Sequence, residues 1–182
     1  MKYNPQQPHR RSIRLKGYDY SQAGAYFITI CAYSRECIFG DVVNGIVKFL
    51  PIGKIAYQYW NEIPKHFKNV ELDEFMVMPN HIHGIIVINS YVGVQNFEPL
   101  RKQNQFQHTM PSSIGSIIRT YKSAVTHLCK GNSYEHFKWQ RNYYEHIIRD
   151  ENDLYQIREY ILNNPLKWEL DEENPKNIKC KL

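Results

Sequence analysis

Two histidines, His81 and His83, stand two residues apart, directly before the apolar run at residues 85–88. Because the side chains of a β-strand alternate between its two faces, residues at this spacing point the same way and place two imidazoles side by side. Two neighbouring imidazoles on a rigid strand can bind one divalent metal ion. The alternative is a pair of hydrogen-bonded histidines on a sheet face, and the choice between them depends on residues further along the chain.

A second candidate for chemistry is Tyr143. If the residues around it form a helix, Tyr144, Ile147 and Ile148 make an apolar stripe. Tyr143 and His146 then lie on a different, polar face. A tyrosine can act as a nucleophile, but its phenol titrates near pH 10, so its target must already be activated by a metal ion or a base. The alternative is an ordinary interfacial aromatic, because the chain has 14 tyrosines.

Five blocks of the sequence, in this order, resemble the single-tyrosine HUH transposases and, among these, the REP-associated tyrosine transposases. The His81-Ile82-His83 triplet looks like the HUH motif of histidine, hydrophobic residue and histidine. Residues 139–143, with the helix expected after them, look like the tyrosine segment of these enzymes. The five blocks are residues 11–20, 26–30, 78–83, 139–149 and 160–165.

The resemblance implies metal-dependent nicking and strand transfer of single-stranded DNA that carries hairpin-forming repeats. Tyr143 would attack a phosphodiester to give a 5′-phosphotyrosine and a free 3′-hydroxyl, while a divalent ion on His81 and His83 polarises the phosphate. The expected ion is Mg²⁺ or Mn²⁺, of which Mn²⁺ matches imidazole better, and zinc stays an alternative. Two other functions stay open: a non-catalytic, domesticated nucleic-acid-binding module of the same fold, and a metal-dependent nuclease that uses water.

Related enzymes take a third metal ligand four residues after the tyrosine, where this chain has Ile147. Isoleucine cannot bind a metal ion. We therefore expect His146, three residues after Tyr143 on the same helical face, to be the third ligand. The alternatives are Gln140, Glu145 and Asp150.

Composition indicates one domain with an ordinary core, because 42% of the 182 residues are hydrophobic. The net charge of +5 is mild for a nucleic-acid-binding protein, so its distribution matters more than its sum. Two groups of cations are expected to contact DNA phosphates, with a solvated surface as the alternative for each. They are Arg10, Arg11, Arg14 and Lys16 in a basic N-terminal arm, and Arg119 and Lys122 on a helix.

No run of about 20 apolar residues occurs and the N-terminus has no apolar signal core, so we expect a cytoplasmic protein with no membrane partner. The four cysteines lack the CxxC spacing of metal or redox sites and are expected to be reduced. In related insertion-sequence transposases the tyrosine helix of one chain can complete the metal site of another. A homodimer and a monomer therefore both stay open.

The hydrophobic pattern predicts strands at 26–32, 70–78, 82–88 and 135–139, with helices at 52–63, 113–130, after 139 and at 154–161. Asn44-Gly45 predicts a small hairpin between the first strand and the first helix. The order β, α, β, β, α, β plus extra C-terminal helices predicts a ferredoxin-like α+β fold, an antiparallel sheet with helices on one face. We divide the chain into a basic arm (1–20), one HUH-like catalytic domain (21–170) with a flexible loop at about 90–111, and a polar tail (171–182) that frays.

Overall fold

A four-stranded antiparallel sheet, in the order β4-β5-β1-β6, forms the centre of the protein. The computed structural model describes residues 18–90, 112–171 and 173–178. The strands of the sheet are β1 (Gly24–Cys31), β4 (Val70–Val77), β5 (His81–Ile88) and β6 (Tyr144–Ile148). The expected α+β fold with an antiparallel sheet is confirmed.

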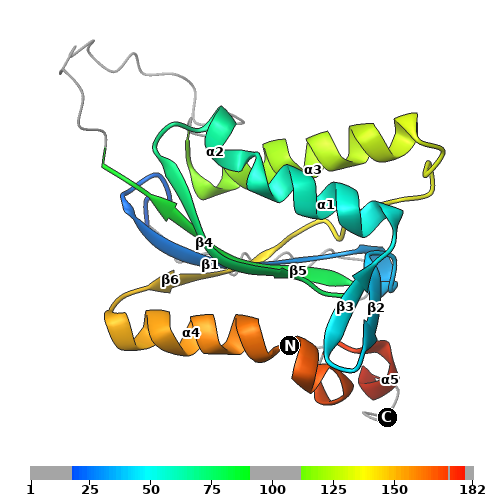
Figure 1. The fold of residues 1–182 in the computed structure, drawn as a ribbon. Coiled ribbons are helices and arrows are strands. Elements are labelled where there is room, and N and C mark those ends of the chain that lie inside the picture. Colours follow the sequence, from blue (N-terminus) through cyan, green and yellow to red (C-terminus); the bar gives the residue numbers. More distant parts are fainter. Residues whose placement is uncertain (1–17, 91–111, 172, 179–182) are drawn as a thin grey trace, which may run out of the picture.

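Helices cover both faces of this sheet (Figure 1). One face carries α1 (Pro51–Asn61), α2 (Ile63–His66) and α3 (Ile114–Gly131), and the other carries α4 (Glu151–Asn163). Pro51 is the first residue of α1 and Pro64 the second residue of α2, where the missing N–H of a proline costs nothing. The side chains of Ser113 and Asp150 cap the backbone N–H groups at the starts of α3 and α4. Among the helices that the structure describes, none is both long and apolar enough to span a membrane.

The alternation of side chains along the strands divides the core into two unequal parts. Tyr26 and Ile28 of β1 and Ile82 of β5 point into the main core beneath α1 and α3. Phe27 and Ile85 point the other way and meet Ile161 of α4 in a much smaller cluster. The odd-numbered residues of β5, the two histidines among them, therefore face α4.

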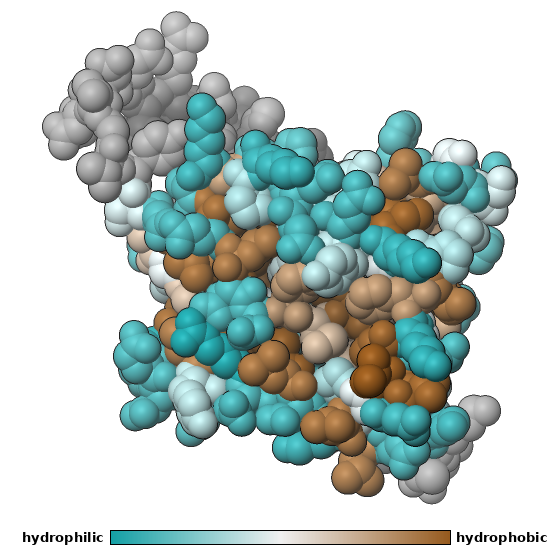
Figure 2. Space-filling view, viewed as in Figure 1, coloured by the Kyte–Doolittle hydropathy of each residue, from teal (hydrophilic) through white to brown (hydrophobic). Residues whose placement is uncertain are grey.

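The expected hairpin is present as β2 (Gly40–Val43) and β3 (Ile46–Phe49). Asn44 and Gly45 both have positive φ, 53° and 72°, as its two-residue turn requires. The hairpin tip lies against η2 (Pro165–Leu170), so closely that a Cβ added at Gly45 would come 2.4 Å from a methyl group of Leu166. Figure 2 shows hydrophobic side chains at the surface over this part of the molecule, and Ile46 and Leu166 are both largely exposed. The packing fixes the path of the chain just after α4.

The last strand of the sheet differs from the sequence prediction. Residues 135–139 do not form a sheet strand, and Trp139 makes an isolated bridge with Ala32, the residue after β1. The fourth strand is β6, where a helix was expected, and it pairs with residues 25–29 of β1. The predicted loop at about 90–111 lies outside the described residues apart from its first position, and the N-terminal arm lies outside them up to residue 17.

Candidate active site

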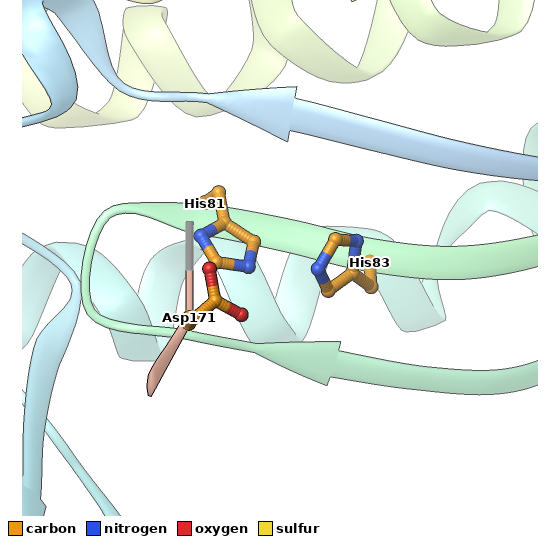
Figure 3. Close-up of side chains that lie close together, drawn as sticks. All are labelled: His81, His83 and Asp171. Carbon is orange, nitrogen blue, oxygen red and sulfur yellow. The ribbon is translucent and has the colours of Figure 1, made fainter. Parts of the chain in front are cut away.

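His81 and His83 lie side by side on β5, with ring centroids 4.3 Å apart (Figure 3). β5 is an interior strand that pairs with β4 on one side and β1 on the other. Both histidines are buried, with exposed fractions of 0% and 2%. The structure thus brings the two imidazoles together on one face, as their spacing predicts, and holds them on the most rigid part of the sheet.

Each imidazole uses its Nδ1 atom within the protein. His81 Nδ1 lies 2.8 Å from Asn80 Oδ1, and His83 Nδ1 lies 2.9 Å from Thr29 Oγ1. The Asn80 amide nitrogen donates to the carbonyl oxygens of Arg35 and a second residue, so its Oδ1 is an acceptor for a proton on His81 Nδ1. The lone pair of His81 is then on Nε2, which has no hydrogen-bond partner in the described part of the chain. This is the tautomer that binds a metal ion through Nε2.

Burial keeps both histidines neutral. Burial, helped by the nearby Arg35 guanidinium, lowers the pKa of His81 to about 3. Burial and the neighbouring His81 ring hold the pKa of His83 well below its ordinary value. Neutral imidazole is the form that metal ions bind, so the pair is ready to bind at physiological pH without first losing a proton.

Asp171, which follows η2, adds a carboxylate to the histidine pair (Figure 3). Ligand atoms of the three residues all lie within 4.8 Å of one another. Asn164, at the C-terminal end of α4, donates its amide N–H to Asp171 Oδ2 at 2.9 Å. The Oδ1 atom of Asn164 is buried and has no hydrogen-bond partner among the described residues.

These residues fit a divalent metal ion. Buried imidazole nitrogens and amide oxygens without partners are rare in folded proteins, and such atoms are available as metal ligands. Two imidazoles, one carboxylate and one amide oxygen are a mixed nitrogen and oxygen ligand set that suits Mn²⁺ or Mg²⁺, and zinc as well.

A tyrosine of α4 completes the site. The hydroxyl of Tyr160 lies 3.1 Å from His83 Nε2, and its ring packs against His83 and Phe27 with centroid separations of 5.0 and 6.0 Å. The side chain is 44% exposed and lines a cavity of about 520 Å³ together with His83, Asn164 and Asp171. The phenol is therefore held beside the candidate metal ligands and open to a substrate.

Tyr143, the tyrosine that the sequence favoured, lies elsewhere. It precedes β6 in an extended segment and packs against the main core, which is on the α1 and α3 face of the sheet. His81 and His83 point to the opposite face. The expected helix at this point is wrong, and the aromatic and β-branched residues that suggested its apolar stripe instead form a strand paired with β1.

His146 also lies outside the candidate metal group. It is on β6, two strands away from β5, and its Nε2 atom is bonded to Asp153 Oδ2 at 2.8 Å. Two of the alternatives, Glu145 and Asp150, do not belong to the group formed by the described residues either. Glu145 pairs with a β1 residue of the main core and so points to the opposite face, and Asp150 caps α4. Gln140 accepts a hydrogen bond from a lysine through its backbone carbonyl.

The cations proposed for DNA contacts are only partly described. Arg10, Arg11, Arg14 and Lys16 lie outside the described residues. Arg119 is exposed on α3, while the Nζ atom of Lys122 lies 2.6 Å from the carbonyl oxygen of Gln140. Burial lowers the pKa of Lys122 to about 8. Lys122 therefore holds the segment before β6 in place, and a DNA contact by it or by Arg119 stays a prediction.

The polar tail packs against the site where the structure describes it. The carboxylate of Glu173 lies 3.0 Å from the Arg35 guanidinium, and its carbonyl accepts from Asn80 Nδ2 at 2.7 Å. Asn174 is 4% exposed and donates to the carbonyl of Trp168. These contacts hold Glu173 and Asn174 against η1, Asn80 and η2, whereas the segment was expected to fray.

Sequence reasoning missed Tyr160, Asn164 and Asp171. Tyr160 and Asn164 lie in one of the five resembling blocks and are four residues apart. This is the spacing between tyrosine and third metal ligand in related enzymes, at which Tyr143 has only Ile147. That spacing was the signal that could have identified them. Asp171 lies in a polar stretch without a motif, and only the packing of η2 brings it to the histidines.

No protein-family model matches the chain. A Haemophilus influenzae protein whose recorded name is "uncharacterized protein" is 48% identical over 173 residues, which cover 94% of this chain and 96% of the relative. A second Haemophilus influenzae protein, provisionally named a REP-associated tyrosine transposase, is 25% identical over 150 residues, covering 82% of this chain and 74% of that protein.

Among solved structures, a REP-associated tyrosine transposase bound to a REP hairpin has a similar fold. The TM-score is 0.57 at 18% sequence identity, and the similarity covers 86% of this chain and 74% of that one. The chain therefore belongs to one protein family with the uncharacterized Haemophilus influenzae relative, and it has the fold of a REP-associated tyrosine transposase.

Proposed function

We propose that this protein is a metal-dependent transposase that nicks and rejoins single-stranded DNA at hairpin-forming repeats, with Tyr160 as its nucleophile. One observation carries the proposal: the Tyr160 hydroxyl lies 3.1 Å from His83 Nε2, beside His81 and Asp171 and open to a cavity. A phenol, two neutral imidazoles and a carboxylate gathered in this way are the groups that nucleophilic attack on a phosphodiester needs. The related fold of a transposase bound to a DNA hairpin supports the substrate class.

The nicking step exchanges one phosphorus–oxygen bond for another. The Tyr160 oxygen attacks the phosphorus, and the bond to the 3′ oxygen of the preceding nucleotide breaks, leaving a 5′-phosphotyrosine and a free 3′-hydroxyl. The phenol loses one proton and the leaving oxygen gains one, so the step is balanced without a nucleotide triphosphate. In the reverse sense, a 3′-hydroxyl of a second strand attacks the phosphotyrosine and restores the phenol.

The residues divide this work. His81, His83, Asp171 and Asn164 would hold a divalent ion, Mg²⁺ or Mn²⁺, whose chemistry is Lewis-acid polarisation of the phosphate oxygens. In the structure His83 Nε2 is hydrogen-bonded to the Tyr160 hydroxyl, and a bound ion would take the place of this hydrogen bond and leave the phenol beside it. Phe27 packs edge to face against the ring of Tyr160, with an interplanar angle of 87°, and so helps to orient the phenol. The substrate backbone would enter the cavity that these side chains line.

All of these groups come from one chain. α4 brings Tyr160 to the histidines of the same molecule, which supports a site that needs no residue from a second chain. A homodimer that exchanges the tyrosine helix would need α4 to leave this position.

A covalent adduct with labelled DNA tests the proposal. A single-stranded oligonucleotide that folds into a hairpin with single-stranded flanks is incubated with the full chain and Mn²⁺ or Mg²⁺, and adducts are resolved under denaturing conditions. We expect an adduct with the wild type and none with Tyr160→Phe, which keeps the ring contacts. Tyr143→Phe is the matched control and should form the adduct normally.

The other outcomes identify the rival functions. An adduct that survives Tyr160→Phe but disappears in Tyr143→Phe would overturn the assignment of the nucleophile. Cleavage without any adduct, unaffected by Tyr160→Phe, would identify a nuclease that uses water. Binding without cleavage at any metal concentration would identify a non-catalytic module.

A further inference from the structure

A second cavity, of about 520 Å³, lies between η1 (Tyr33–Arg35) and the C-terminal end of α3. Its lining includes one exposed tyrosine and three cations, Tyr33, Lys130, Lys138 and Arg141. We propose that this cavity binds a nucleotide of the single strand that flanks the scissile phosphate, with the base against Tyr33 and its phosphates against the cations. The proposal rests on the proposed function and adds a substrate subsite to it.

The aromatic side chains of this cavity suit an unpaired base. Tyr33 is 57% exposed, which leaves its ring available for stacking. Phe137 and Trp139, which also line the cavity, pack edge to face with centroids 4.9 Å apart, and Phe137 is buried. They form a fixed apolar wall behind an exposed aromatic ring. Proteins that bind single strands combine such stacking rings with a cationic groove, because every base has a stacking face.

The charges of the cavity suit phosphate groups. Lys130, Lys138 and Arg141 are exposed and form no ion pair with any other described residue, and a single acid, Glu135, lines the cavity with them. The contrast is a cavity beside β4 that has two acids and a single arginine in its lining. That arginine is already bonded to one of the acids. Of these two aromatic cavities, only the first offers free positive charge.

The position of the cavity connects it to the candidate active site. The backbone N–H of Tyr33 donates to the carbonyl of Lys138, and the N–H of Gln140 donates to Cys31 at the end of β1. Cys31 pairs on its other side with His81. Neighbouring strands are about 4.8 Å apart, so the backbone at the cavity wall lies roughly 10 Å from the backbone of His81. The cavity is on the α3 side of the sheet and the His81 side chain points to the α4 side, so a strand that connects them has to pass around the end of the sheet. A short stretch of single strand can cover this distance.

The η1 turn joins the two places directly. The carbonyl of Arg35, at the end of η1, accepts a hydrogen bond from the side chain of Asn80, which also orients His81. Tyr33, two residues earlier, lines the cavity on the other side of the turn. A strand leaving the site over η1 would therefore meet Tyr33 next.

Binding of flanked and unflanked DNA tests the subsite. The probes are a fluorescein-labelled hairpin oligonucleotide with single-stranded flanks and the same hairpin without them, titrated with the full chain and followed by anisotropy. We expect Tyr33→Ala to weaken binding of the flanked probe by about 5- to 150-fold. The unflanked probe should bind Tyr33→Ala as tightly as it binds the wild type. Tyr33→Phe, which keeps the aromatic ring, should bind the flanked probe as tightly as the wild type does. Tyr57→Ala, in the acidic cavity beside β4, is the matched control and should bind both probes normally.

An abasic scan locates the base. One flank position at a time is made abasic, and the loss of affinity is compared between the wild type and Tyr33→Ala. We expect one flank position at which removing the base weakens binding to the wild type but does not weaken binding to Tyr33→Ala any further. Such a result is the signature of direct coupling between that base and Tyr33. Losses that add independently at every flank position would overturn the subsite.

The salt dependence tests the cations. The double variant Lys138→Ala with Arg141→Ala should reduce the slope of log affinity against log salt by roughly 1.4, since each phosphate contact on a single strand contributes about 0.7. The double variant Lys54→Ala with Lys65→Ala, two exposed lysines of α1 and α2 that do not line the cavity, is the control and should keep the slope. An unchanged slope in the first variant would remove the cations from the proposal.

Adduct formation with the same flanked probe keeps the two proposals separate. An adduct with the wild type together with no effect of Tyr33→Ala overturns the subsite alone. A coupled effect of Tyr33 without any adduct overturns the nicking activity and leaves a single-strand subsite.

Discussion

Replacing Thr29 with valine tests whether His83 binds a metal ion through Nε2. Thr29 Oγ1 lies 2.9 Å from His83 Nδ1, and Thr29 is 8% exposed on β1. Valine keeps the shape of the side chain and the β-branched preference for a strand, but it removes the hydroxyl. The ring of His83 then loses the group that fixes its tautomer and orientation. We expect Thr29→Val to bind Mn²⁺ more weakly than the wild type.

The size of the effect follows from the role of the hydrogen bond. Loss of a hydrogen-bond partner behind a ligating histidine weakens metal binding by about 10- to 100-fold, or about 1.4 to 2.7 kcal/mol. The fold itself is also destabilised, because burying Nδ1 without a partner costs about 1 to 3 kcal/mol. Isothermal titration with Mn²⁺ measures the first quantity, and urea unfolding of the metal-free protein measures the second.

Thr126→Val is the matched control for this substitution. It also removes one hydroxyl hydrogen bond, from Thr126 Oγ1 to the carbonyl of Lys122 at 2.7 Å, but on α3 on the other face of the sheet. Its Mn²⁺ affinity should equal that of the wild type. If Thr29→Val binds Mn²⁺ within twofold of the wild type while showing the expected loss of stability, His83 is not a ligand and the metal assignment is refuted.

Three further substitutions test the site and its support. Asn164→Ala should weaken Mn²⁺ binding by at least about tenfold in the same titration, and full affinity would exclude its amide oxygen as a ligand. Gly84→Ala should lower the free energy of unfolding by about 1 to 3 kcal/mol, because its Cβ would come 2.3 Å from the indole of a buried tryptophan. Gly131→Ala, whose Cβ meets nothing within 4 Å, is its control, and equal stability of the two variants would contradict the packing. Hydrogen bonds from Arg158 lower the pKa of Asp73, so this carboxylate stabilises the fold above about pH 4 and loses that effect as the pH falls further. Melting temperatures of Asp73→Asn should therefore lie closer to wild type at pH 3 than at pH 7, and a gap that does not narrow would show that the ion pair contributes nothing.

Local patterns predicted the parts of the fold that local chemistry determines. The two-residue spacing of His81 and His83 was enough to place both on one strand face, because strand periodicity leaves no other arrangement. Asn44-Gly45 was enough for the hairpin, because this pair tolerates the positive φ of its turn.

The segment after Trp139 could not be assigned in the same way. Its apolar residues satisfy helical spacing at Tyr144, Ile147 and Ile148, yet the run is short and rich in residues that favour strands. The unpaired side of β1 accepts it as the fourth strand. That partner strand is more than a hundred residues away in the sequence, so the residues around the segment do not indicate that it pairs with β1.

The candidate site, too, could be predicted only in part from the sequence. The chain has fourteen tyrosines, any of which could be the nucleophile by residue type alone. Tyr143, in the segment that resembles the tyrosine segment of the transposases, packs on the side of the sheet opposite to the histidines. Tyr160 and Asn164 could have been chosen by their four-residue spacing alone. Asp171 could not, because its approach to the histidines depends on the turn of η2 against the hairpin.

The two halves of the site are held with unequal strength. The histidines sit on an interior strand whose other face contributes to the large core, whereas α4 has one buried residue, Ile161. α4 is further fastened by the bidentate contact of Arg158 with Asp73 on β4 and by the hydrogen bond of Tyr160 to His83. The proposed nucleophile is thus on the layer that costs least free energy to displace, while the proposed metal ligands are on an interior strand of the sheet. A site that must form a covalent link to one strand and then receive a second strand needs this division, since the phosphotyrosine has to shift while the histidines keep their geometry.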